Sequence, residues 1–116
     1  MDRGDVYLVD LALPNRDDPT GAPITLKKYV VVLRGGDAVE GETDVPVIIA
    51  STNRRGGDRA LRRFEVGVGE SHGFHHATVL DCRWPATLTK SHLSGGRYCF
   101  RLSAETMQDV DRKSVV

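Results

Sequence analysis

Two lysines and a tyrosine stand directly before a run of four apolar residues in TLKKYVVVLR, which spans residues 25–34. A continuous run of β-branched and aliphatic residues is typical of a strand buried on both faces. Lys27 and Lys28 therefore precede a buried strand, either as solubilising gatekeepers or as cations that bind a negatively charged partner. The second interpretation would fix a positive charge at the edge of a substrate groove.

Positive charge is also concentrated in residues 53–63, NRRGGDRALRR, which hold five arginines and one aspartate. Sixteen acidic and sixteen basic residues cancel over the whole chain, so net charge neither favours nor excludes a nucleic-acid partner. A local basic stripe attracts phosphates. A solvated surface loop is an equally good interpretation of this segment.

The order of apolar runs and turn formers predicts a single domain over residues 1–116. Strands are predicted over residues 5–11, 28–34, 45–50, 61–66, 77–82 and 97–102. Ser103 is placed to cap a final helix that packs through Ala104, Met107 and Val110. Short strands in series with one closing helix indicate a mostly β, small and strongly bent antiparallel sheet or barrel.

Composition favours a cytoplasmic protein. No apolar run approaches the roughly 18 residues of a membrane span, and MDRGDVYLVD lacks the basic-then-apolar order of a secretory signal. Cys82 and Cys99 are too few for a disulfide framework. A bridge between these two cysteines stays open if their strands pair.

Three segments, in the same order, resemble the MazF/PemK family of toxin endoribonucleases. They are RGDVYLVDL, TGAPITLKKYVVVL and TVLDCRWPATLTKSHLSGGRYCFRLSAETMQDVD, which together cover most of the chain. The last is the most specific, and the order and spacing of all three carry the resemblance.

The resemblance implies an SH3-like barrel of the PemK/CcdB type that works as a homodimer. It also implies cleavage of single-stranded RNA at short sequences without a metal or another cofactor, and neutralisation by an antitoxin protein that lies across the RNA groove. In such a reaction the 2′-hydroxyl attacks the neighbouring phosphate and leaves a 2′,3′-cyclic phosphate. The site must move two protons and neutralise charge on the phosphate oxygens.

In the family an Arg-Pro at the start of the second strand and a Thr-Ser at the end of the third carry the chemistry. Lys28-Tyr29 and Ser51-Thr52 occupy these positions here. The resemblance therefore makes Lys28, Ser51 and Thr52 catalytic candidates, with Tyr29 beside them for stacking on a base. A lysine is ordinarily protonated at neutral pH, so we expect Lys28 to act mainly by electrostatic stabilisation.

The third segment adds Arg83 as a catalytic candidate and Asp81 as an RNA contact, with acid and base exchanged relative to some family members. Because they flank Cys82, they can share one face of a strand and form a salt bridge or a phosphate contact. Arg54 and Arg55 follow directly on the hydroxyl pair, which favours phosphate contact by these arginines.

Histidines 72, 75 and 76 in SHGFHH raise the question of a metal site. No cysteine or clustered carboxylate completes a ligand set, so an exposed, turn-like loop is the better prediction. A histidine of this loop acting as general base on RNA is a lesser alternative. His92, in KSHLSGG, is predicted to lie in a turn.

Two other functions remain open. The substitutions at Lys28, Ser51 and the Asp81/Arg83 pair allow a catalytically impaired fold that only binds RNA, DNA or an antitoxin. A gyrase poison of the CcdB type ranks lower, because such toxins resemble one another in a C-terminal Trp-Gly-Ile, whereas this chain ends in Lys-Ser-Val-Val.

Overall fold

The computed structural model describes residues 2–13, 17–18, 20–34, 44–52, 61, 64–83 and 85–114. The elements of this described part are β1 (Asp5–Leu13), β2 (Ile24–Val32), β3 (Asp44–Thr52), β4 (Glu65–Val68), the 3-10 helix η1 (Glu70–His72), β5 (Thr78–Asp81), β6 (Ala86–Thr89), α1 (Lys90–Gly95), β7 (Arg97–Arg101) and α2 (Ala104–Lys113). None of the helices described here is long and apolar enough to cross a membrane.

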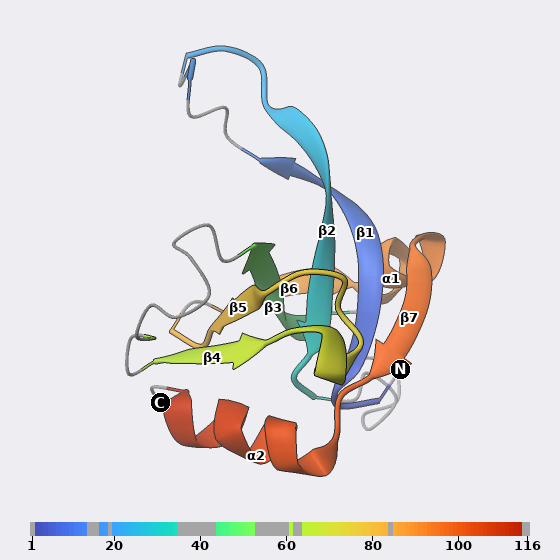
Figure 1. The fold of residues 1–116 in the computed structure, drawn as a ribbon. Coiled ribbons are helices and arrows are strands. Elements are labelled where there is room, and N and C mark those ends of the chain that lie inside the picture. The colour runs from blue at the N-terminus through green and yellow to red at the C-terminus, as the bar shows by residue number, and fades with distance from the viewer. Residues whose placement is uncertain are drawn as a thin grey trace.

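The strands form one strongly bent antiparallel sheet in the order β4-β5-β3-β2-β1-β7, with β6 also paired to β3. β5 pairs with residues 50–52 of β3 and β6 pairs with residues 44–47. The sheet curls into a half-barrel with α2 along one side and α1 close to β1 and β7 (Figure 1). The predicted mostly β architecture is confirmed.

Strand β2 is the wall shared by two hydrophobic clusters. Val31 belongs to a cluster that includes Met107 of α2, whereas Val30 and Val32 belong to a second cluster that includes Leu93 of α1. The three valines are fully buried. Since successive strand residues point to opposite faces, this burial confirms that the apolar run forms a strand covered on both sides.

Helix α2 begins as predicted. The Ser103 hydroxyl accepts a hydrogen bond from the backbone N–H of Thr106 at 3.2 Å, which satisfies a donor of the first helical turn. Met107 and Val110 are buried on the face that covers the first cluster, whereas the prediction that Ala104 packs beside them is wrong, because Ala104 is exposed.

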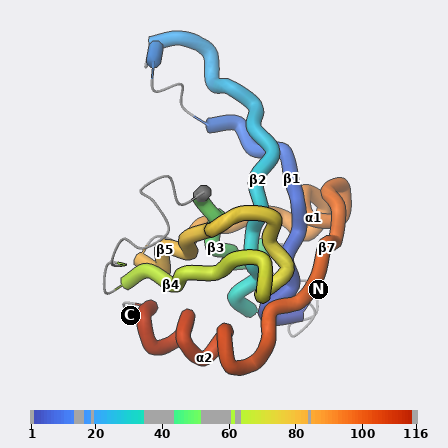
Figure 2. Tube along the Cα trace, viewed as in Figure 1, coloured from blue at the N-terminus to red at the C-terminus, as the bar shows by residue number. Residues whose placement is uncertain are grey.

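Two predicted strand boundaries are wrong. β2 begins at Ile24 rather than at residue 28, because residues 24–27 pair with residues 10–13 of β1 in a long arm that extends beyond the barrel (Figure 2). Residues 24–27 are all exposed, so the β2 strand of the arm has no buried face that a sequence pattern could reveal. β4 covers Glu65–Val68 rather than residues 61–66, and Leu61 lies exposed outside it.

The sequence did not predict β6 or α1, and the predicted turn at His92 is wrong. The hydroxyl of Thr89 caps α1 by accepting from the backbone N–H of His92 at 3.1 Å. Leu93 of the same helix is fully buried in the second cluster. A helix of six residues is too short to show a hydrophobic period.

Both cysteines are free thiols. Cys82 is buried in the first cluster, and this burial is the main cause that raises the pKa of its thiol. Cys99 is half-buried on β7, and its thiol donates to the carbonyl oxygen of Arg97. The bridge that the sequence left open does not form.

The turn after η1 depends on a glycine in the left-handed region. Gly73 has φ of 104°, and a Cβ at this position would approach the Phe100 ring to 3.0 Å. The turn reverses the chain so that Phe74, only 2% exposed, enters the first cluster. The backbone of Gly73 therefore determines where the two histidines that follow Phe74 emerge.

We expect Gly73→Ala to destabilise the fold by about 1–2 kcal/mol, because a non-glycine residue is strained at positive φ. Urea unfolding measures the loss. Gly69→Ala is the matched control: Gly69 caps the other end of η1 with φ of −166°, and a Cβ there meets nothing within 4 Å. Equal stability of the two variants would contradict the role given to the turn.

Candidate functional site

The site lies where β2 and β3 separate. Residues 30–32 of β2 pair with residues 47–49 of β3, but residues 50–52 of β3 pair with β5, on the opposite side from β2 in the sheet order. β2 meanwhile continues along β1 as far as Ile24. The two strands therefore form a fork, and β3 turns away from β2 in Figure 1.

A cavity of about 130 Å³ occupies this fork. Three separate segments line it: the outer part of β2, the end of β3, and the loop before β5. The described lining residues are Lys27, Lys28, Tyr29, Ala50, Ser51, Phe74, His75, His76 and Thr78. The cavity thus brings together two lysines, two aliphatic hydroxyls, one phenol and two imidazoles.

The fork unites several residues that sequence reasoning assigned to one site. Lys28 and Tyr29 enter from β2, and Ser51 enters from β3. Thr52, the next residue of β3, pairs with Thr78 of β5. The predicted RNA contacts Arg54 and Arg55 lie outside the described residues.

His75 and His76 are exposed, as predicted for a loop, but they also line the cavity. Phe74, directly before them, packs edge-to-face on Tyr29 and on Phe100, with ring centroids 5.5 Å and 5.0 Å apart. After them, the Thr78 hydroxyl donates to the carbonyl oxygen of His76 at 2.8 Å. The histidines are therefore held between two buried anchors.

The electrostatics of the cavity favour an anion. None of the described residues that line it is acidic. Lys28 is half-buried, and neither it nor Lys27 has an ion-pair partner in the part of the chain that is described. Unpaired cations beside hydroxyl and imidazole donors suit a phosphate group.

Asp81 and Arg83 are not among the described residues that line the cavity. They lie at the far end of β5, and the Arg83 guanidinium donates to the Asp81 carboxylate at 3.2 Å and 3.4 Å. The guanidinium also stacks over the Phe64 ring, 3.4 Å from its centroid. The salt bridge expected from their spacing is confirmed.

Tyr29 is half-buried, because its ring packs on Phe74 at the edge of the first cluster. Phe74, the second aromatic residue that lines the cavity, is buried. Among the described residues, no group of three or more His, Cys, Asp or Glu side chains is arranged to hold a metal ion.

Comparison with known proteins gives a clear likeness in fold alone. No protein-family model matches the chain, and no curated protein matches it by sequence. An endoribonuclease from Mycobacterial species, solved in complex with its cognate antitoxin, is similar with a TM-score of 0.67 and 21% identity, over 97% of this chain and 89% of that chain.

Two further structures give the same result. A second endoribonuclease from Mycobacterial species has a TM-score of 0.67 and 20% identity, over 97% of this chain and 86% of that one. A MazE-MazF structure from Deinococcus radiodurans has a TM-score of 0.63 and 14% identity, over 97% of this chain and 89% of that chain. The MazF-like fold expected from the sequence resemblance is confirmed.

Proposed function

We propose that this protein is an endoribonuclease toxin that cleaves single-stranded RNA without a metal ion and is neutralised by an antitoxin protein. The observation that carries the proposal is the fork cavity, where Lys28, Ser51 and two histidines meet. The similarity in fold to endoribonucleases, one of them bound to its cognate antitoxin, supports the same reading.

The cavity has the groups that phosphate chemistry requires. The 2′-oxygen forms a bond to phosphorus, the bond from phosphorus to the 5′-oxygen breaks, and the products carry a 2′,3′-cyclic phosphate and a 5′-hydroxyl. Negative charge grows on the non-bridging oxygens in the transition state. Lys28 neutralises this charge as a half-buried ammonium, and the Ser51 hydroxyl donates to the same phosphate.

Proton transfer is assigned to the histidines. Imidazole is the side chain best suited to accept and return a proton near neutral pH. One of His75 and His76 accepts the proton of the 2′-hydroxyl, and the other, as imidazolium, returns one to the departing 5′-oxygen. Both line the cavity, so neither function has to fall on Lys28.

The remaining predicted residues take supporting roles in the proposal. Tyr29 offers the exposed part of its ring to a base, and Thr52 provides a second hydroxyl after Ser51. Arg83, which the resemblance makes a catalytic candidate, does not line the fork cavity, so we assign it an RNA contact beside Asp81 instead. Arg54 and Arg55 contribute phosphate contacts next to β3.

The biological setting follows from the same proposal. The protein acts in the cytoplasm as a homodimer, and an antitoxin occupies the RNA groove until it is removed. The MazE-MazF structure, in which one chain is similar in fold, supports a protein partner of that kind.

Purified protein incubated with mixed single-stranded RNA in EDTA should release fragments that end in a 2′,3′-cyclic phosphate and begin with a 5′-hydroxyl. RNA that carries 2′-deoxyribose at the mapped cleavage position should not be cut, because the nucleophile is missing. The Lys28→Ala/Ser51→Ala double variant, purified in parallel, controls for contaminating nucleases. RNA that is bound without any cyclic ends would instead favour the catalytically impaired binding module.

Lys28→Ala should lower the cleavage rate by about 10²- to 10³-fold, the cost of losing one preorganised charge-stabilising group. Lys28→Arg should keep part of the rate, because it keeps the charge with a different shape. Arg112→Ala is the matched control, since this arginine is exposed on α2 and pairs with Asp109. Undiminished single-turnover cleavage by Lys28→Ala would remove Lys28 from the mechanism.

His75→Ala and His76→Ala should each lower the single-turnover rate by about 10²-fold or more, the usual contribution of a general acid or base. Added imidazole should restore part of the lost activity. Thermal unfolding of the variants checks the fold, which should be intact because both side chains are exposed. If both variants kept full activity, the histidines would not transfer the protons, and Lys28 would be the remaining candidate for this role.

A further inference from the structure

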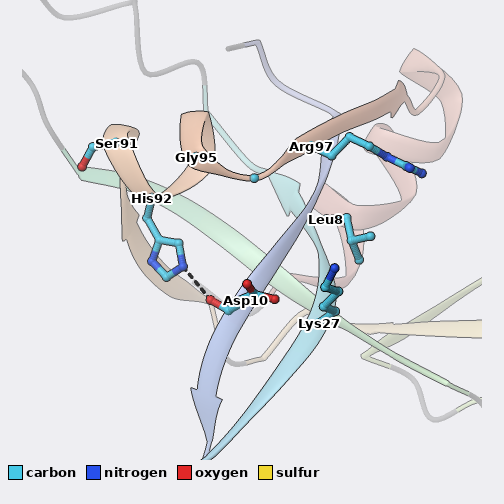
Figure 3. A pocket seen from close by; sticks show the side chains of 8 residues that line it. Leu8, Asp10, Lys27, Ser91, His92, Gly95 and Arg97 are labelled. Atoms are coloured by element: carbon cyan, nitrogen blue, oxygen red, sulfur yellow. Dashed lines mark hydrogen bonds between the residues drawn. The ribbon is translucent and has the colours of Figure 1, made fainter.

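A second and larger cavity, of about 560 Å³, is shown in Figure 3. Residues of β1, β2, α1 and β7 line it: Leu8, Asp10, Lys27, Ser91, His92, Gly95, Gly96 and Arg97. Lys27 also lines the fork cavity. The two cavities therefore share one lining residue.

The wall of the second cavity is fixed by contacts between β1 and α1. The pairing of β7 with β1 reaches Leu8, opposite Arg97, and β1 then continues as far as Leu13. Beyond this point the Nε2 of His92 donates to the carbonyl oxygen of Asp10 at 2.7 Å, the dashed line in Figure 3. Gly96 packs closely against β1, since a Cβ there would lie 2.6 Å from the Leu8 carbonyl oxygen.

The charged side chains of this cavity have no ion-pair partner among the described residues. Asp10 pairs in register with Lys27, and Leu8 with Arg97, so these side chains belong to one face of the sheet. Across the described residues, neither Lys27, Arg97 nor Asp10 takes part in an ion pair. All three are exposed where they border the cavity.

This mixture of groups fits a nucleotide. Phosphates satisfy Lys27 and Arg97, and a base amine or a sugar hydroxyl can donate to the Asp10 carboxylate. The volume lies within the range of about 300–1,000 Å³ that is usual for ligand sites. An acidic peptide fits less well, because its carboxylates would meet Asp10.

We propose that this cavity binds the nucleotide next to the scissile linkage, with Lys27 on the phosphate between the two cavities and Arg97 on the phosphate beyond. The fork cavity, at about 130 Å³, holds the reacting phosphodiester. The inference rests on the proposed function. It makes Lys27 and Arg97 positioning residues that set where the strand is held.

The test measures binding of a 2′-O-methylated oligoribonucleotide, which cannot be cleaved, at several salt concentrations. Lys27→Ala and Arg97→Ala should each weaken binding by about fivefold and lower the slope of log K against log salt by about 0.7, the loss of one phosphate contact to a single strand. Arg112→Ala, an exposed arginine on α2, should change the slope by less than either.

A pair of variants at Gly95 separates charge from folding. A Cβ at Gly95 meets nothing within 4 Å and its φ is not positive, so the backbone accepts a side chain. Gly95→Glu should weaken binding, whereas Gly95→Lys, of similar length, should not. Thermal unfolding should be the same for both variants.

Cleavage of RNA by the wild-type protein is measured in a separate assay, so that the subsite and the nuclease activity are tested independently. If wild-type protein cleaves RNA while Lys27→Ala, Arg97→Ala and Gly95→Glu bind like Arg112→Ala, the subsite is refuted and the nuclease stands. If wild-type protein binds with the expected slopes but does not cleave, the subsite stands and the nuclease is refuted. The subsite is also overturned if the wild-type protein does not bind RNA. It is overturned as well if the three variants bind RNA normally and lose affinity only for a polyglutamate peptide.

Discussion

The divergence of β3 from β2 is the constraint on which the site depends. A strand has only two edges, and β3 serves three neighbours along its length: β2, β6 and β5. β6 and β5 share the edge opposite β2, along successive segments of β3, while on its other edge β3 pairs with β2 only as far as residue 49. The separation opens a cavity beside buried valines, so polar side chains at the fork line this cavity while their backbones stay anchored in the sheet.

Aromatic packing sets the third side of the same cavity. Phe74 joins Tyr29 of β2 to Phe100 of β7 by two edge-to-face contacts, and it is buried among residues of the first cluster. This packing fixes a short loop that would otherwise have few contacts. The two histidines therefore depend on the core for their position, although both are exposed to solvent.

The strength of each local signal explains what the sequence could predict. The valine run of β2 and the Ser103 cap of α2 are strong local patterns: the valines are buried in a strand as predicted, although this strand begins earlier, and α2 begins where predicted. The resemblance placed Lys28 and Ser51 at strand ends that do meet at one cavity. The histidines were assigned only a minor part, because their position depends on Phe74 packing against distant residues, and no local pattern encodes such a contact. β6 and α1 were missed because each is too short to show a period.

Because successive side chains of a strand point to opposite faces, the adjacent lysines of β2 have different roles in the proposal. In register, Lys27 lies opposite Asp10 and Lys28 opposite the buried Val9, so the two side chains start from opposite faces of β2. If β3 still paired with β2 at this point, the two lysines would lie on opposite faces of the sheet and could not both border one cavity. At the fork β2 has lost β3 as a neighbour, and both residues border the opening. Lys28 is half-buried there, which suits charge stabilisation, whereas exposed Lys27 also borders the larger cavity and suits the binding of a longer strand.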